Sequence, residues 1–193
     1  LFLVHRADRP PGPDTPAVLY GYGGFNISLT PGYSRHIGPF LDAGGLWVVA
    51  HLRGGGEYGE AWHRAGMQGN KARVFEDFEA VAAHLVAQRY TRPERLAVMG
   101  GSNGGLLTGA AVTRFSQGFA AAVIRVPLLD MLRYHRFQIA RLWIPEYGDP
   151  EVAADFAWLR SWSPYHHVPA GFHSPAVLLT AGEGDSRVDP LHA

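Results

Sequence analysis

The sequence predicts an α/β protein with a mostly parallel, doubly wound sheet flanked by helices. Short apolar runs recur along the chain without the polar–apolar alternation of a half-exposed strand, so each is expected to be a strand buried on both faces. The runs are 17–20, 46–50, 96–99, 121–124 and 176–180. Helical patterns lie between them, and alternating strands and helices are typical of a parallel sheet covered by helices.

The helices are predicted by apolar residues spaced three and four positions apart. The clearest stripe runs through 74–86, with acidic residues in its early turns. A second helix is expected over 152–162, ending before Pro164, and a third over 106–112. The chain opens on an apolar segment, 1–4, that is expected to be a strand.

Composition narrows the class of protein and of partner. Of the 193 residues, 47% are hydrophobic and 18% charged, with 17 basic and 17 acidic side chains. We therefore expect one sizeable globular domain, with neither nucleic acid nor a membrane as its partner. No apolar run could span a bilayer and no signal peptide is recognised, so a cytoplasmic location is expected, with a periplasmic one left open. The absence of cysteine excludes disulfides, thiolate catalysis and cysteine-based zinc sites, and neither a cofactor nor a metal is expected.

Both ends of the chain are expected to be cut. The first residues begin a strand without a methionine, and the last, 189–193, stop where a helix could begin. We therefore expect a fragment of a longer protein. The isolated fragment would expose a sheet edge and is expected to have low solubility.

The most informative motif is G-x-S-x-G, formed by Gly100, Ser102 and Gly104. It lies between an apolar run and a predicted helix, the context of a nucleophile elbow, in which a serine hydroxyl is exposed above a sheet. A Cβ beside Ser102 is expected to collide with the neighbouring strand or helix, which explains the glycines. The pattern alone is common by chance, so its context carries the interpretation of Ser102 as a nucleophile.

A second glycine motif, formed by Gly54, Gly56 and Gly59, matches the G-x-G-x-x-G pattern of dinucleotide-binding sites. Its context does not fit, because those glycines should open a helix and a clean helix is expected only near residue 72. No strand ending in an acidic residue follows about 20 residues later, where a ribose ligand is expected. We therefore expect a tight structural loop.

A serine nucleophile requires a base and an acid that orients the base, in the chain order serine, acid, histidine. The best acid is Asp185, in a glycine-rich loop at the carboxyl end of the last apolar run. Glu183 is the alternative, less favoured because it lies closer to the strand. Asp130 and Asp149 are expected to be helix caps or turn residues.

None of the ten histidines has the position expected of the base. His192 follows Asp185 too closely, on an expected helix, and would point away. His166 and His167 precede the acid, and His135 lies in a stretch rich in Arg and Tyr. We expect these to be surface or packing histidines, and the base to lie beyond residue 193.

Further motifs occur in a fixed order along the chain. They are YGYGGFN at 20–26, RGGGEYG at 53–59, GGSNGG at 100–105 and DSRV at 185–188, with shorter matches at 130–132 and 146–148. In order and spacing they resemble the motifs of the prolyl oligopeptidase family of serine peptidases. The resemblance covers essentially the whole chain and is far more specific than the elbow alone.

The resemblance implies an α/β-hydrolase fold and a serine endopeptidase that cleaves short proline-containing peptides. Members of the family combine the hydrolase domain with a β-propeller that restricts access to short peptides. Residues 1–193 would then be part of the peptidase domain, with the propeller and the C-terminal part that holds the catalytic histidine outside this chain. The full-length protein is expected to be a monomer acting on oligopeptides, and the chain by itself to be inactive.

The resemblance also implies roles for catalytic residues. Ser102 would attack the scissile carbonyl, and Asp185 would orient the histidine that this chain lacks. The backbone N–H of Asn103 and the hydroxyl of Tyr22 would bind the oxyanion, and such donors are each worth on the order of 3 kcal/mol. Without the resemblance, Tyr22 would be interpreted as a packed core aromatic.

Substrate-binding roles are implied in the same way. Trp143 would stack on the substrate proline ring, and Phe25, Tyr147 and Val188 would line the walls of the slot. Arg187 would bind the carbonyl of the preceding substrate residue with the directed donors of its guanidinium. A flat apolar slot suits a ring that has no hydrogen-bond donor.

One segment departs from the family pattern. Arg125 and Pro127 stand where proline-specific members carry small or neutral residues, which argues against strict proline preference but not against hydrolysis. Two other functions stay open. One is an esterase or acylaminoacyl-type hydrolase of the same fold, against which Arg187 and Trp143 argue, and the other is a non-catalytic binding module.

Overall fold

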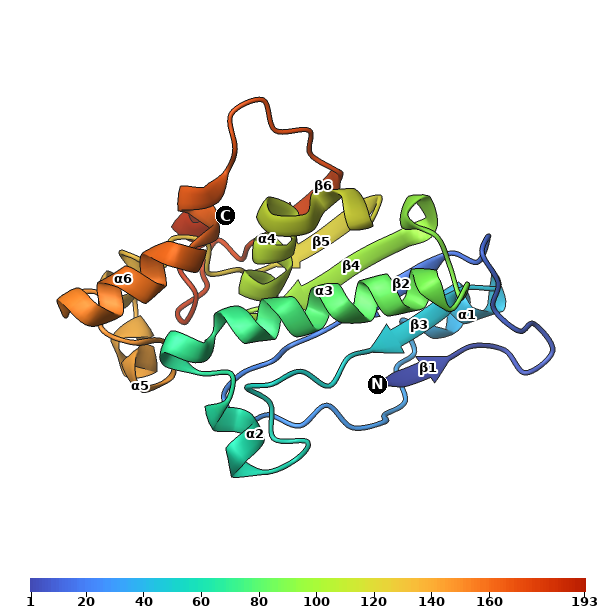
Figure 1. Ribbon diagram of the computed structural model, residues 1–193, viewed down its shortest axis with the longest axis horizontal. Helices are drawn as coiled ribbons and strands as arrows, with labels where there is room; N and C mark the ends of the chain where they lie inside the picture. Colours follow the sequence, from blue (N-terminus) through green and yellow to red (C-terminus); the bar gives the residue numbers. More distant parts are fainter.

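The computed structural model describes residues 1–193 and contains a six-stranded, mostly parallel sheet (Figure 1). The strands are β1 (Phe2–Val4), β2 (Ala17–Tyr20), β3 (Leu46–Val49), β4 (Leu96–Gly101), β5 (Ala121–Arg125) and β6 (Ala176–Thr180). Their order is β1-β3-β2-β4-β5-β6, in which β1 is antiparallel to β3 and all other neighbours are parallel. Every predicted strand is present, and the predicted fold class is confirmed.

The α-helices are α1 (Gly38–Asp42), α2 (Glu60–Arg64), α3 (Ala72–Ala87), α4 (Asn103–Phe115), α5 (Ile144–Tyr147) and α6 (Ala153–Trp162). Figure 1 shows α3 and α4 lying across one face of the sheet, with α5 and α6 beyond its end. The three predicted helices are confirmed as α3, α4 and α6. None of the helices combines the length and the hydropathy that a bilayer crossing requires.

The connections between strands reverse direction between β2 and β4. β2 is followed in the chain by β3 on one side, whereas β4 is followed by β5 on the other. Ligands of doubly wound sheets bind at the carboxyl ends of the strands at such a switch point. Because Tyr20 pairs with Met99, the loops that follow β2 and β4 start side by side. The topology therefore places the motifs 20–26 and 100–105 at the expected site.

One face of the sheet is buried and the other only half-buried, so the expectation of strands buried on both faces is wrong. Buried residues alternate with partly exposed ones in β2, β3 and β4, and β6 at the sheet edge is mostly exposed. The buried positions join the core with residues of α3 and α4, whereas Tyr20 and Trp47 on the other face stack with ring centroids 6.0 Å apart. The sequence hides this alternation because both sets of positions are apolar.

The apolar stripe of α3 faces the core as predicted. Its buried members are Val74, Phe75, Phe78, Ala82 and Leu85. Phe75 also meets Trp162 of α6 edge-on, with ring centroids 5.8 Å apart, so α6 is fixed against the same core.

Candidate active site

Ser102 occupies the sharp turn between β4 and α4. Its backbone has φ 57° and ψ −118°, a region that residues with a side chain rarely adopt. The Ser102 N–H donates to the carbonyl oxygen of Arg125 on β5 at 2.9 Å, and the Ser102 carbonyl accepts from Leu106 N–H of α4 at 3.0 Å. The turn is thus fixed from both sides, with the geometry expected of a nucleophile elbow.

The glycines around Ser102 are sterically required. A Cβ on Gly100 would overlap the carbonyl oxygen of Gly104, and one on Gly104 would lie 2.6 Å from the Gly21 carbonyl oxygen. A Cβ on Gly105 would lie 2.7 Å from the Arg125 carbonyl oxygen. These obstacles are backbone atoms, which cannot move aside without disturbing α4, β5 or the loop that follows β2.

Replacing Gly100 with alanine is expected to destabilise the protein by about 3 kcal/mol, because the new methyl group meets backbone. Gly12→Ala is the matched control, since nothing lies within 4 Å of its added Cβ, and should change stability by less than about 0.5 kcal/mol. Urea unfolding of both variants measures the difference. Equal stability of the two would contradict the close packing described for the turn.

Tyr22 and Asn103 lie next to the serine. Burial raises the pKa of Tyr22 above its ordinary value of 10.0, and hydrogen bonding with Ser102 opposes this shift. The phenol therefore keeps its proton at neutral pH and can donate it. The N–H of Asn103 belongs to the first turn of α4, where backbone donors have no intrahelical partner.

The buried side chain of Asn103 also connects two walls of the site. Its Nδ2 donates to the Tyr22 carbonyl oxygen at 2.5 Å, and its Oδ1 accepts from the Tyr147 hydroxyl at 2.9 Å. The resemblance assigned Asn103 only a backbone role. Sequence reasoning missed this bridge because its partners come from distant segments.

Six of the residues assigned to the site line one pocket of about 260 Å³. They are Tyr22, Phe25, Ser102, Trp143, Tyr147 and Arg187. The Phe25 and Tyr147 rings meet edge-on, with centroids 5.5 Å apart at 88°. The pocket thus combines a hydroxyl, aromatic walls and one guanidinium.

Three lining residues were missed: Ile27, Leu128 and Leu142. Leu142 precedes Trp143, and Leu128 follows the carboxyl end of β5, so their positions in the sequence could have identified both as pocket residues. Val188 was assigned to the wall, but it is buried in the core and is not among the residues lining the pocket.

Asp185 lies in the loop after β6, the same loop that brings Arg187 to the pocket. Its Oδ1 accepts from the N–H groups of Arg187 at 2.8 Å and Val188 at 3.0 Å. These two hydrogen bonds lower the pKa of Asp185 below its ordinary value. The carboxylate is therefore ionised and held in place at neutral pH.

The glycine-rich loop 53–59 is a structural support, as expected. A Cβ on Gly54 would lie 2.7 Å from the Gly23 carbonyl oxygen, so this loop packs tightly against the one that carries Tyr22. The Asp77 carboxylate binds Arg53 of the motif through Nε at 2.8 Å and Nη2 at 2.6 Å. One detail of the expectation is wrong, because α2 begins directly after Gly59, although it has only five residues.

The histidines near the C-terminus pack elsewhere. His192 is buried against Phe137 with ring centroids 5.2 Å apart. His166 Nδ1 lies 2.9 Å from the Ser163 hydroxyl, but that serine is fully buried and out of reach of a substrate. Asp130 accepts from Leu132 N–H at 3.1 Å, as a turn residue does. No histidine lines the pocket that contains the elbow serine.

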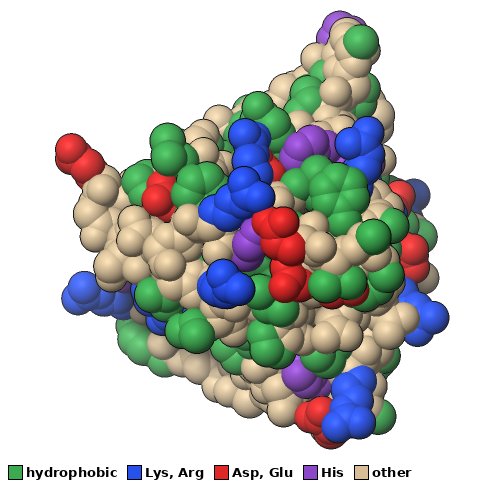
Figure 2. Space-filling model, turned by 90° about the vertical axis from the view of Figure 1, so that its left-hand side faces the viewer, with side chains coloured by type: hydrophobic (Ala, Val, Ile, Leu, Met, Phe, Trp, Pro, Cys, Tyr) green, Lys and Arg blue, Asp and Glu red, His purple; other side chains and the backbone are tan.

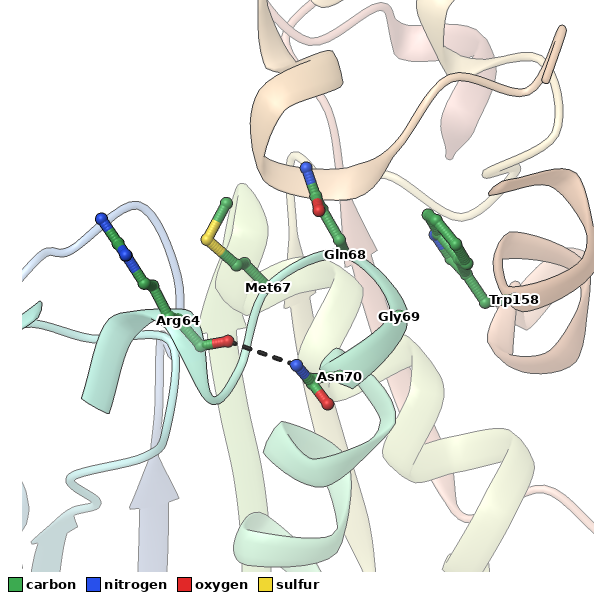
Figure 3. Close-up of a pocket in the computed structure, with 6 residues that line it drawn as sticks. All are labelled: Arg64, Met67, Gln68, Gly69, Asn70 and Trp158. Atoms are coloured by element: carbon green, nitrogen blue, oxygen red, sulfur yellow. Dashed lines mark hydrogen bonds between the residues drawn. The ribbon is translucent and has the colours of Figure 1, made fainter. Parts of the chain in front are cut away.

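A larger hollow, of about 430 Å³, shares no lining residue with this pocket (Figure 3). It is lined by Arg64, Met67, Gln68, Gly69, Asn70 and Trp158. It offers neither a nucleophile nor a general base, so size alone does not make it the candidate site.

No group of three or more metal-ligating side chains is found in the structure. On the face shown in Figure 2, acidic, basic and hydrophobic side chains are interspersed.

Comparisons with known proteins point to one family. The family model described as the prolyl oligopeptidase family matches residues 31–193. An uncharacterized peptidase of Sinorhizobium fredii, y4nA, is 45% identical over 193 residues, covering 100% of this chain and 27% of the relative. Prolyl oligopeptidase A of Amanita bisporigera is 42% identical over 195 residues, covering 100% of this chain and 26% of the relative.

The fold comparison agrees. A solved structure from a mechanistic analysis of two prolyl endopeptidases superimposes with a TM-score of 0.97 at 54% identity. The match covers 98% of this chain and 28% of the chain in that solved structure. The chain spans about a quarter of the length of the curated relatives it matches.

Proposed function

The chain belongs to the prolyl oligopeptidase family, and from this premise we propose that it carries the nucleophile of a serine peptidase for short proline-containing peptides. Residues 1–193 form part of an α/β-hydrolase domain in this proposal. The remainder of the full-length protein supplies the propeller and the catalytic histidine. The observation that carries the proposal is the single pocket shared by the Ser102 hydroxyl, an aromatic slot and Arg187.

The proposed reaction starts with attack of the Ser102 hydroxyl oxygen on the scissile carbonyl carbon. The histidine takes the hydroxyl proton as the new C–O bond forms, and returns it to the leaving amine as the C–N bond breaks. Water then hydrolyses the acyl-enzyme by the same two proton transfers. Asp185, ionised and fixed by the N–H groups of Arg187 and Val188, holds the histidine in the required tautomer.

Two donors are proposed to stabilise the oxyanion. The Asn103 N–H at the start of α4 and the Tyr22 hydroxyl both lie beside the nucleophile. The Asn103 N–H is oriented by α4, and the Asn103 side chain holds the Tyr22 backbone through its carbonyl. Preorganised donors of this kind stabilise the negative charge that develops in the transition state.

The aromatic slot is proposed to select proline. Trp143 lines the slot together with the Phe25 and Tyr147 rings, which are perpendicular to each other. A proline ring fills such a slot without leaving a polar group unpaired. Arg187, which lines the same pocket, is proposed to donate to the carbonyl of the preceding substrate residue.

Replacing Tyr22 with phenylalanine is expected to lower kcat by about 10²–10³-fold, because one oxyanion donor is lost. KM should change by less than about threefold, since the hydroxyl acts mainly on the transition state. Steady-state kinetics on a proline amide substrate measures both constants. A large rise in KM with unchanged kcat would assign Tyr22 to substrate binding instead.

The proposed specificity is tested by comparing a Gly-Pro amide with a simple aryl ester on the full-length protein. Efficient cleavage of the amide supports a proline-directed peptidase. Turnover of the ester alone would favour an esterase or acylaminoacyl-type hydrolase. Turnover of neither, with no fluorophosphonate labelling of Ser102, would indicate a non-catalytic binding module.

A further inference from the structure

A buried cluster of charged side chains lies behind the pocket and takes no part in the proposed chemistry. Lys71 and Glu146 are only 1% and 5% exposed. The Lys71 Nζ lies 3.5 Å from Glu146 Oε1 and donates to the Gly23 carbonyl oxygen at 2.9 Å. His63 Nε2 lies 2.9 Å from the other carboxylate oxygen of Glu146. Burying charges is costly, so a role for this cluster is expected.

Glu146 joins the two aromatic walls of the slot. Its Oε1 accepts from the Phe25 N–H at 3.0 Å, while Glu146 itself is the neighbour of Tyr147 in α5. Phe25 has φ 57°, a left-handed conformation that a residue with a side chain adopts only when its surroundings impose it. The carboxylate thus holds one wall in place relative to the helix that carries the other.

We propose that Glu146, itself held by Lys71 and His63, is a positioning residue that sets the spacing between the Phe25 and Tyr147 rings and thereby the selection of proline. The inference rests on the proposed function, because it concerns the slot of that reaction. Burial lowers the pKa of Lys71 from 10.5 to about 8, and Glu146 opposes this shift. Lys71 therefore remains charged at neutral pH and can hold the carboxylate.

The nucleophile is held by different contacts. Ser102 is fixed by Arg125 of β5 and by α4, and the Tyr22 carbonyl is held by Asn103. None of these contacts includes Glu146. A change at Glu146 should therefore affect a substrate that fills the slot more than a small ester that does not.

The test uses Glu146→Gln in the full-length protein with two substrates, a Gly-Pro amide and p-nitrophenyl acetate. Gln keeps the size of the side chain but leaves Lys71 without its charge partner. We expect kcat/KM for the proline amide to fall by about 30-fold, mainly through KM. The fold-decrease in kcat/KM for the ester should be at least about fivefold smaller than that for the amide.

Two further variants make the result decisive. The double variant Lys71→Met/Glu146→Gln removes both members of the ion pair, so it leaves neither charge unpaired in the core. It is used if the single variant does not fold. The loss of kcat/KM should again be larger for the proline amide than for the ester. Glu151→Gln is the matched control, because Glu151 also has a histidine and a cationic partner, His135 at 3.0 Å and Arg136 at 2.7 Å, but does not line the pocket. It should leave kcat/KM unchanged for both substrates.

The outcomes separate this inference from the proposed function. Equal losses with both substrates, or no loss with either, would overturn the positioning role while leaving the peptidase proposal intact. A wild-type protein that hydrolyses only the ester would overturn the peptidase proposal, and the inference with it.

Discussion

Replacing Ser102 with alanine in the full-length protein is expected to lower kcat for a proline-containing peptide by about 10⁶-fold. The variant loses the only hydroxyl at the elbow, and with it both the acyl-enzyme and labelling by a fluorophosphonate. The fold should be retained, because the hydrogen bonds that fix the turn use the Ser102 backbone. Steady-state kinetics and probe labelling measure the two losses.

Ser163→Ala is the matched control for this experiment. Unlike Ser102, Ser163 has a histidine neighbour within this chain, with its Oγ 2.9 Å from His166 Nδ1, but Ser163 is fully buried. The control variant should retain labelling, although loss of the hydrogen bond from Met131 N–H lowers its stability. Cleavage that persists in the Ser102 variant would end the assignment of the nucleophile.

Asp185→Asn is expected to lower kcat by about 10⁴-fold. The amide oxygen of asparagine can still accept from the N–H groups of Arg187 and Val188, so the loop should keep its shape. The lost charge would leave the histidine without the partner that fixes its tautomer. Kinetics together with unchanged thermal unfolding would separate this effect from a loss of structure. Activity within a few-fold of wild type would instead favour Glu183 as the acid.

The pH dependence gives a second check on Asp185. Folding lowers the pKa of Asp185 below 3.8, so the carboxylate contributes stability above that pH and loses it as the pH falls through the lowered value. It is therefore fully ionised throughout mildly acidic conditions. A fall in kcat/KM between about pH 7 and pH 5 would report protonation of the histidine rather than of Asp185. Because a neighbouring carboxylate raises a histidine pKa, the acidic limb of the Asp185→Asn variant should shift to lower pH.

Features determined by neighbouring residues could be predicted from the sequence. The elbow needs only an apolar run, small residues around Ser102 and a helix after it, and the strands 17–20 and 176–180 have the predicted bounds. The order of strands and helices sufficed for the fold class. The sequence did not show that only one face of the sheet is fully buried, because an apolar residue is compatible with both a buried and a half-buried position.

Features that depend on distant contacts could not be predicted. Glu146 bonds to Phe25 and His63, which lie 121 and 83 positions away, and nothing in its own motif indicates those partners. Ile27 and Val188 show the same limit, since loop packing alone decides that one reaches the pocket and the other the core.

The backbone of Ser102 carries a consequence for engineering. A conformation of φ 57° and ψ −118° costs a residue with a side chain on the order of 1–3 kcal/mol, and glycine would avoid most of it. The same exchange that relaxes the turn removes the hydroxyl proposed as the nucleophile. Laboratory evolution that selects for thermal stability alone would therefore favour glycine at position 102 and give an inactive protein. Turnover must be screened together with stability.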